Sequence, residues 1–474
     1  GSSWYPIIDS GGINGIYGDV RSIITNDPNP VLKPVGLLAF SNVSTNTVTI
    51  NWTNIEGEDG YKIERADNSD CSGNPTFYTI ATVNQKNIVQ YVDNSVVSEN
   101  KYCYRVKAYR GTDHGPYSNL RYIIIPSSNL PKIYVGGLYS LAGSQHANNI
   151  GYLTGNHWYT LAEGTTGDTD YYNGSVNALL LMNSDLYVGG SFLSAGTIRT
   201  PLITLWNENQ WYNLGSDINY INDRVEALTV IGTDLYVGGM FQSWSNITFN
   251  SIARWNGSQW YSLSTGVSAG YDSGTVYALT SLGSDLYIAG YFTAPAKNIA
   301  RWDGNTWYSL ATGVNNTVYA LATLEANLYA GGIFTSSGTQ SLKSIARWDG
   351  NAWTSLANGV NSTVYTLVTL GTDLYVGGTF TSNGNNTQLL NKIARWNGNS
   401  WSALGEGLNN TVYALATLGT DLYVGGTFTS NGNNTQLLNK IARWNGSSWY
   451  PIIDSGGING IYGNSVNSII IKSP

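Results

Sequence analysis

Carboxylates that could serve a hydrolase are scattered along this chain. A glycosidase needs two carboxylates placed across one scissile bond. The acidic residues that are specific to one place in the sequence are Glu163, Asp168, Asp170, Asp217, Asp223, Glu226 and Asp272. No pair among them shows the spacing of an acid and its partner base. We therefore expect no enzyme, with a glycoside hydrolase as a remote alternative.

Metal chemistry has one candidate. Asp168, Asp170 and Asn173 could offer oxygen ligands to calcium, although this segment lacks a full ligand series. The three histidines are far apart in sequence and match no spacing typical of zinc or copper ligands. We expect no resident cofactor other than possible calcium.

Cys71 and Cys103 are the two cysteines of the chain. In an oxidising compartment they could form a disulfide, which on the chain-entropy model stabilises by about 3 to 4 kcal/mol. Two separate buried thiols are the alternative.

The composition limits the possible partners. Only 11% of the 474 residues are charged and the net charge is −7, so no basic patch is available to neutralise phosphates. Nucleic acid is therefore excluded as a main partner. The longest apolar runs fall far short of the roughly 18 residues of a membrane span. The 12% of aromatic residues favours a folded, β-rich chain.

Internal repeats give the strongest signal in the sequence. A unit of the form V-x-A-L-x-x-x-G-x-D-L-Y-V-G-G-x-F, a loop, and I-A-R-W-x-G-x-x-W-x-x-L recurs in steps of 42 to 54 residues. Its first valines are Val176, Val225, Val276, Val318, Val364, Val412 and Val466. Apolar residues alternate with period two within each unit, and Asn-Gly or Asp-Gly stands where a tight hairpin would join two strands. We expect double glycines such as Gly377 and Gly378 to reverse the chain after the second strand. Each unit predicts a four-stranded antiparallel blade.

Blades of this length must stack around an axis to bury both faces of each sheet. The double glycine and the tryptophan of the last strand resemble kelch-type propellers. The G-G-x-F, I-A-R-W and W-x-x-L repeats resemble bacterial extracellular propeller proteins more closely. The second-strand signature, Leu-Tyr in six units and Ile133-Tyr134 in the first, occurs seven times, so we expect an all-β fold with seven blades over residues 129–474. The first blade lacks its inner strand, and we expect 466–471 to supply it by pairing with 132–137.

Two duplications suggest an array. Residues 1–18 are identical to 446–463, and 369–398 are identical to 417–446. The domain 1–28 is therefore equivalent to 446–471, and since the ring already contains one copy, the other should belong to a neighbouring propeller. An artificial overlap between the two ends of the sequence is the alternative explanation. The residues expected to mediate assembly are Trp4, Tyr5, Ile7, Val20, Ile23, Val466 and Ile469.

Residues 29–128 break the repeat. The strands expected at 47–52, 61–65, 102–108 and 121–125 resemble a fibronectin type III domain, with Trp52 matching its strand B tryptophan and Tyr102 its tyrosine corner. Because Cys103 lies between two core tyrosines, we expect its side chain to face away from the sandwich core. Such modules usually act as spacers.

The recurring arginines, such as Arg254 and Arg443, are expected to stack on tryptophans or to pair with the aspartates of the second strands. Aromatic residues in the variable loops could instead form a glycan-binding surface. They are Tyr171, Tyr172, Tyr220, Trp244 and Tyr271.

These features together predict a secreted or cell-surface protein without enzymatic activity. The leading hypothesis is a structural unit that self-associates into a fibre, sheath or adhesin stalk, with propeller beads joined through fibronectin-like spacers. A glycan-binding adhesin that uses the loop face is the alternative. Whether units join within one polypeptide or by strand exchange stays open.

Overall fold

The computed structural model describes residues 32–36, 38–41, 43–127, 129–168, 173–214, 223–244, 247–270 and 272–474. The regular structure of these residues consists of β-strands, and no helix that could span a membrane is found among them. They form two compact units. One contains residues 32–38, 52–90 and 103–122, and the other contains 39–51, 91–102 and 123–474. The predicted division at residues 28 and 128 stays a prediction.

The first eight strands form two antiparallel sheets. One has the order β1-β2-β5, and the other has the order β4-β3-β6-β7 with β8 also paired to β6. Their bounds are β1 (Ala39–Ser41), β2 (Val48–Asn51), β3 (Gly60–Asp67), β4 (Tyr78–Val83), β5 (Gln90–Asp93), β6 (Lys101–Arg110), β7 (Asp113–Tyr117) and β8 (Arg121–Ile124). The Tyr102 hydroxyl accepts a hydrogen bond from the backbone N–H of Val97 at 2.9 Å, the kind of contact that a tyrosine corner makes.

Cys71 and Cys103 form a disulfide that closes a loop between β3 and β6, with their Cα atoms 5.3 Å apart. Cys103 is fully buried, as are its neighbours Tyr102 and Tyr104. Alternation along a strand led us to expect a side chain facing away from the core. The Cys103 side chain is nevertheless buried. It forms its disulfide with Cys71, which lies in a segment outside the strands.

The sheet that begins at Lys132 is completed by the C-terminal strand of the chain. β9 (Lys132–Ala142) pairs with β10 (Gln145–His146), with β11 (Ile150–Thr154) and with the C-terminal strand β46 (Ile461–Lys472). β11 also pairs with β12 (His157–Thr160). Val466 lies opposite Gly137, and Ile471 lies opposite Ile133, in an antiparallel register.

Six further four-stranded antiparallel sheets follow, each built from strands in chain order. They are β14 (Ser175–Met182), β15 (Asp185–Ser191), β18 (Ile203–Trp206) and β19 (Trp211–Asn213); β20 (Arg224–Ile231), β21 (Asp234–Met240), β24 (Ile252–Trp255) and β25 (Trp260–Ser262); β28 (Thr275–Leu282), β29 (Asp285–Tyr291), β30 (Ile299–Trp302) and β31 (Trp307–Ser309); β32 (Val318–Leu324), β33 (Asn327–Gly332), β36 (Ile345–Trp348) and β37 (Trp353–Ser355); β38 (Val364–Leu370), β39 (Asp373–Gly378), β40 (Ile393–Trp396) and β41 (Trp401–Ala403); and β42 (Val412–Leu418), β43 (Asp421–Gly426), β44 (Ile441–Trp444) and β45 (Trp449–Pro451).

The remaining strands of the described residues are two residues long and lie in the loops. They are β13 (Thr165–Thr166), β16 (Ser194–Ala195), β17 (Ile198–Arg199), β22 (Ser243–Trp244), β23 (Ile247–Thr248), β26 (Ser268–Ala269), β27 (Asp272–Ser273), β34 (Ser336–Ser337) and β35 (Gln340–Ser341). They form small sheets of two or three strands beside the four-stranded ones.

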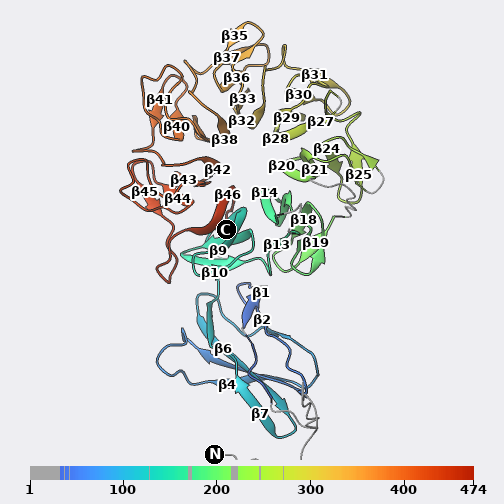
Figure 1. The fold of residues 1–474 in the computed structure, drawn as a ribbon, viewed down its shortest axis with the longest axis vertical. Helices are drawn as coiled ribbons and strands as arrows, with labels where there is room; N and C mark the ends of the chain where they lie inside the picture. The colour runs from blue at the N-terminus through green and yellow to red at the C-terminus, as the bar shows by residue number, and fades with distance from the viewer. Residues whose placement is uncertain are drawn as a thin grey trace, which may run out of the picture. The chain divides into compact units, whose positions relative to one another are not determined.

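We call the strands β14, β20, β28, β32, β38, β42 and β46 the inner strands. Each inner strand lies next to the inner strand of the following sheet, and β46 lies next to β14. Figure 1 shows the sheets of this region following one another around a common centre, with the inner strands nearest to it.

The paired glycines lie within the second strands and do not reverse the chain, so the prediction of a turn is wrong. A Cβ on Gly331 would meet the Val364 side chain of the next sheet at 2.3 Å, and a Cβ on Gly332 would meet the Thr317 carbonyl oxygen of its own sheet at 2.2 Å. Neither glycine has a positive φ. Glycine is therefore required at both positions, because the next sheet approaches Gly331 closely and the neighbouring backbone approaches Gly332 closely.

Neighbouring sheets share their buried clusters. In one cluster, Tyr329 and Ile345 of one sheet pack with Val364, Val376 and Phe380 of the next. Burial of each such side chain stabilises by about 1.5 to 3 kcal/mol. The last strands add a directional contact, because the indole N–H of Trp449 donates to the Leu404 carbonyl oxygen of the preceding sheet at 2.9 Å.

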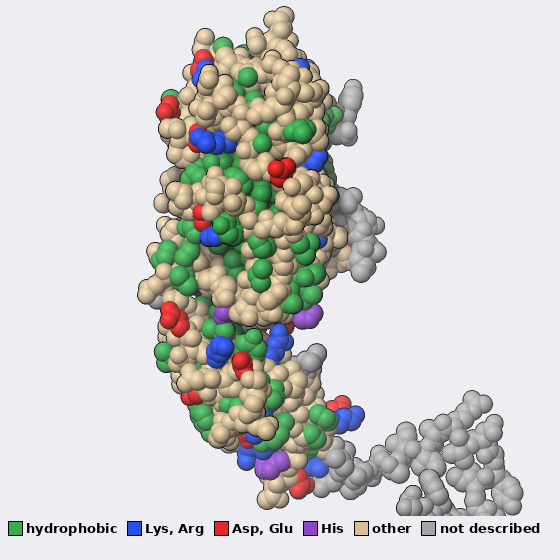
Figure 2. Space-filling view, turned by 90° about the vertical axis from the view of Figure 1, so that its left-hand side faces the viewer, with side chains coloured by type: hydrophobic (Ala, Val, Ile, Leu, Met, Phe, Trp, Pro, Cys, Tyr) green, Lys and Arg blue, Asp and Glu red, His purple; other side chains and the backbone are tan. Residues whose placement is uncertain are grey.

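The surface reflects the low charge of the sequence. On the face seen in Figure 2, lysine and arginine side chains lie singly or in small groups among polar side chains and backbone. This face therefore offers no broad basic surface of the kind that binds nucleic acid.

Candidate functional site

Most of the predicted glycan-binding residues lie outside the described residues. This applies to Tyr171, Tyr172, Tyr220 and Tyr271. The backbone of Trp244 belongs to β22, but its side chain is not described. The loop surface therefore stays a prediction.

The predicted calcium ligands are described in part. Asp168 is exposed, and the Asn173 side-chain oxygen accepts the backbone N–H of Ser175 at 3.0 Å. Asp170 lies outside the described residues. Across the ranges that the structure describes, no group of three or more His, Cys, Asp or Glu residues is arranged to hold a metal ion.

The predicted assembly residues divide into two sets. Trp4, Tyr5, Ile7, Val20 and Ile23 lie outside the described residues. Val466 and Ile469 lie in β46 and are buried. Both of them pack at the position where Gly425 would carry a Cβ, at 2.3 Å and 3.1 Å. We call the contact of β46 with β9 the seam.

A charged cluster, which sequence reasoning missed, spans the seam. Glu208 accepts a hydrogen bond from Lys132 of β9 at 2.7 Å and another from Lys472 of β46. Burial raises the pKa of Glu208, but the two ammonium groups outweigh it and hold that pKa below the usual value. The cluster therefore ties both strands of the seam to the following sheet.

The sequence does contain a signal for this cluster. Glu208 has a φ of 74°, at a hairpin position where the later sheets have glycines such as Gly257 and Gly304. A non-glycine residue in the left-handed region costs about 1 to 2 kcal/mol. A glutamate in place of the expected glycine therefore indicates a compensating contact.

The recurring arginines pair with aspartates, which is one of the two predicted alternatives. Arg301 contacts Asp285 at 3.0 Å, Arg395 contacts Asp373 at 2.7 Å, and the pairs of Arg254 and Arg443 are similar. The ring that Arg301 lies over belongs to Tyr308, at 4.5 Å, and Arg254 and Arg443 likewise lie over tyrosines. These half-exposed pairs contribute little stability.

A second candidate site lies where the inner strands face one another. Each inner strand carries a β-bulge directly after its first valine, as between Val318 and Ala320. A bulge leaves one residue outside the regular pairing and re-aims its side chain. The residues at this position are Asn177, Glu226, Tyr277, Tyr319, Tyr365, Tyr413 and Asn467.

Four successive bulge positions hold tyrosines, which we call the tyrosine arc. The ring centroids of Tyr277 and Tyr319 are 5.0 Å apart, and those of Tyr319 and Tyr365 and of Tyr365 and Tyr413 are each 5.1 Å apart. The planes are tilted by 47° to 59°. Such tilted contacts are favourable between aromatic rings. The arc forms a continuous aromatic wall.

The other three bulge positions form a polar arc. The Asn467 amide nitrogen donates to the Asn177 side-chain oxygen at 3.4 Å, and Asn177 also interacts with the Glu226 carboxylate. Arg224 donates to Glu226 through Nε, and its guanidinium lies within hydrogen-bonding reach of Tyr277. Burial raises the pKa of Glu226, while Arg224 opposes that rise.

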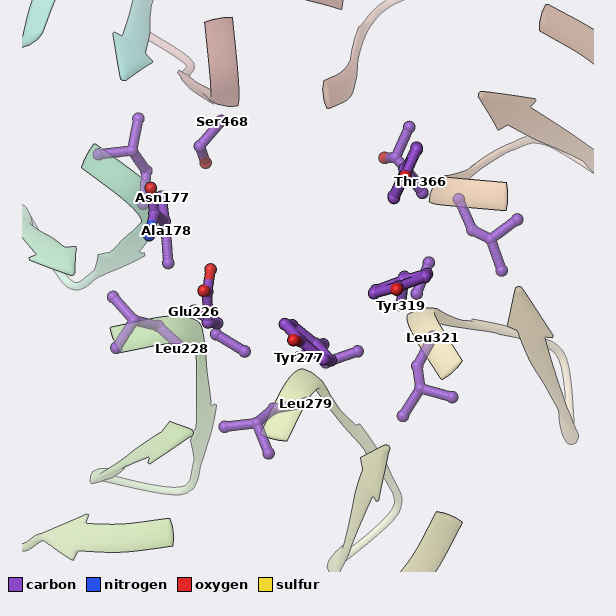
Figure 3. A pocket seen from close by; sticks show the side chains of 16 residues that line it. Asn177, Ala178, Glu226, Leu228, Tyr277, Leu279, Tyr319, Leu321, Thr366 and Ser468 are labelled. Atoms are coloured by element: carbon purple, nitrogen blue, oxygen red, sulfur yellow. The ribbon is translucent and has the colours of Figure 1, made fainter. Parts of the chain in front are cut away.

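Members of both arcs line a cavity of about 200 Å³, which we call the inner cavity; they are Asn177, Glu226, Tyr277, Tyr319 and Tyr365. Figure 3 shows Glu226, Tyr277 and Tyr319 beside the same open space, with Ser468 and Thr366 on its other sides. Among the described residues that line it, Glu226 is the one carboxylate. Asp223 is three residues away in sequence and is buried, which raises its pKa to about 7. The inner cavity therefore supplies binding groups and no facing pair of carboxylates.

Comparisons with known proteins add information about only one part of the fold. No family model and no curated protein matches the chain. A solved structure of an Fn3-like protein from Clostridium thermocellum is 28% identical, covering 21% of this chain and 96% of that one, with a TM-score of 0.18. The third fibronectin III domain of human KIAA0343 protein is 18% identical, covering 23% of this chain and 95% of that one, with a TM-score of 0.19. Both of these solved structures match about a fifth of this chain.

Proposed function

We propose that residues 129–474 form a seven-bladed, kelch-like β-propeller closed by β46. We further propose that the chain is a non-enzymatic repeating unit of an extracellular fibre, sheath or adhesin stalk. The succession of the inner strands, in which β46 lies next to β14, supports the propeller. The disulfide between Cys71 and Cys103 supports an oxidising, extracellular location.

The observation that carries the array is the occupied seam. β46 pairs with β9 over ten residue pairs, from Ile461 opposite Ala142 to Lys472 opposite Lys132. Residues 1–18 repeat the segment 446–463 that leads into this strand, and Val20 to Ile24 parallels Val466 to Ile470. One ring has room for one such segment. The second copy therefore has no place in its own ring, and it would fit the seam of a neighbouring unit in which that unit's own copy is absent or displaced.

Truncation tests this proposal. A chain of residues 1–445 lacks β46 and so has an empty place beside β9. We expect it to form head-to-tail oligomers in size-exclusion chromatography with light scattering, because residues 1–24 of one molecule fill the seam of another. A matched chain of residues 29–445 lacks both copies and should not form such oligomers.

Native material gives an independent measurement. Electron microscopy should show strings with a regular repeat. Isolated native monomers, together with the same number of chains per particle for the 1–445 and 29–445 chains, would contradict the proposal. Added peptide 446–474 should suppress oligomers of the 1–445 chain by filling the seam first.

A further inference from the structure

The units of the repeat do not all carry the same residues beside the inner cavity, as a purely structural role would allow. Four units have tyrosine directly after the first valine, and the unit of β20 has Arg224-Val225-Glu226 where the next has Thr275-Val276-Tyr277. Two substitutions in one unit thus introduce an ion pair beside the tyrosine arc. Packing alone does not call for a partly buried ion pair, because desolvation offsets part of its Coulombic gain.

The side chains around the inner cavity are suited to a molecule with both apolar and hydroxylated faces. The tyrosine arc offers ring surface together with phenolic hydroxyls. Glu226 offers acceptor oxygens, and Asn177 offers both a donor and an acceptor. The Glu226 side chain keeps 18% exposure although protein atoms surround it, because it borders the inner cavity.

Charge and size narrow the class of ligand. Arg224 already balances Glu226, so neither an organic cation nor an anion finds an uncompensated partner there. The volume of about 200 Å³ is below the roughly 300 to 1,000 Å³ of pockets for drug-sized ligands. A single sugar ring matches this size, and its hydroxyl groups and C–H faces match the two arcs.

We propose that the inner cavity binds one neutral pyranose ring, held by stacking on the tyrosine arc and by hydrogen bonds to Glu226 and Asn177. This site is distinct from the loop surface predicted from the sequence. It does not depend on array formation, since its lining comes from one chain.

Saturation-transfer NMR and calorimetry on the 1–474 chain test the proposal. The probes are glucose, galactose, mannose and N-acetylglucosamine, with glucuronate as the charged comparison and tetramethylammonium as the cationic one. We expect one of the neutral sugars to bind, and to bind more tightly than glucuronate or tetramethylammonium.

Variants locate the site. Tyr319→Leu and Glu226→Gln should each weaken binding by about tenfold or more, which corresponds to about 1.4 kcal/mol. Tyr291→Leu is the matched control, because Tyr291 is 56% exposed and does not line the inner cavity. It should leave the affinity unchanged. Unchanged melting temperatures would show that each variant is folded.

Several results would overturn the proposal. They are the absence of binding for all four neutral sugars, tighter binding of either charged probe, and sugar binding that both Tyr319→Leu and Glu226→Gln leave intact. The last result would assign the sugar to another surface, such as the loops.

Discussion

The paired glycines allow a stringent test of how neighbouring sheets approach one another. Gly331 and Gly332 are adjacent in β33, yet a Cβ would meet different obstacles at each. At Gly331 the obstacle is a side chain, Val364 of the next sheet, at 2.3 Å. At Gly332 it is backbone, the Thr317 carbonyl oxygen, at 2.2 Å. The same substitution should therefore have two different costs.

Another sheet of the chain has an alanine at the position equivalent to Gly331, which shows that alanine is tolerated there. Ala289 stands there in β29, fully buried, and is followed by Gly290. We expect Gly331→Ala to cost about 1 to 3 kcal/mol, the usual range for overpacking that side chains can relieve. Gly332→Ala requires the backbone at Thr317 and Val318 to move away from β33, because a backbone atom cannot rotate aside as a side chain can. We expect it to cost more than about 4 kcal/mol, a loss reserved for severe disruptions.

Urea unfolding followed by tryptophan fluorescence measures both costs. The Trp348 and Trp353 rings of this sheet, whose centroids are 5.4 Å apart, contribute to this signal together with the other tryptophans of the chain. Equal destabilisation by the two substitutions would refute the reasoning. So would a loss below about 1 kcal/mol for Gly332→Ala.

Three other perturbations probe separate contacts. Trp449→Phe should cost about 1 kcal/mol more than Trp307→Phe in urea unfolding, because Trp449 donates to Leu404 while the Trp307 indole nitrogen has no acceptor among the described residues. Equal losses would show that this bond adds nothing. Glu208→Gln should lower the melting temperature at pH 7, and the difference should disappear as the pH falls from 4.5 through the lower folded-state pKa, because a carboxylate with a lowered pKa stabilises only while it is ionised in the folded state. A pH-independent difference would contradict the ionic cluster. Replacing Cys71 and Cys103 together by alanine should destabilise the sheets of strands β1–β8 by about 3 to 4 kcal/mol in urea unfolding, and an unaffected midpoint would contradict this expectation.

The repeats made the sheets predictable from sequence. Their period, the Asn-Gly and Asp-Gly hairpins and the alternating apolar residues mark four strands per unit. The aspartate partners of the recurring arginines were also within reach, because both residues recur at fixed positions. The tyrosine rings that lie beside Arg254, Arg301 and Arg443 were missed, although each follows a last-strand tryptophan directly, as Tyr308 follows Trp307.

What the sequence left open depends on contacts between units. The role of Gly331 depends on Val364 in the next sheet, which is far away in the chain and invisible to local turn rules. The tyrosine arc was hidden because strict alternation assumes unbroken pairing, whereas a bulge separates Val318 from Ala320. Glu226 was noted as an acidic residue without a partner, yet Arg224 two positions earlier is its partner.

The seam offers the most direct test of the central claim. Leu141 of β9 lies opposite Tyr462 of β46, and Tyr17 is the equivalent of Tyr462 in the first copy. Directly opposed strand residues are close enough for a disulfide. Cross-linking is therefore measured by non-reducing electrophoresis in two double variants of the 1–474 chain, Leu141→Cys with Tyr462→Cys and Leu141→Cys with Tyr17→Cys. We expect the first to cross-link within each monomer and the second to form no bond within a monomer. An intramolecular bond between positions 141 and 17, with none between 141 and 462, would contradict closure by the C-terminal strand.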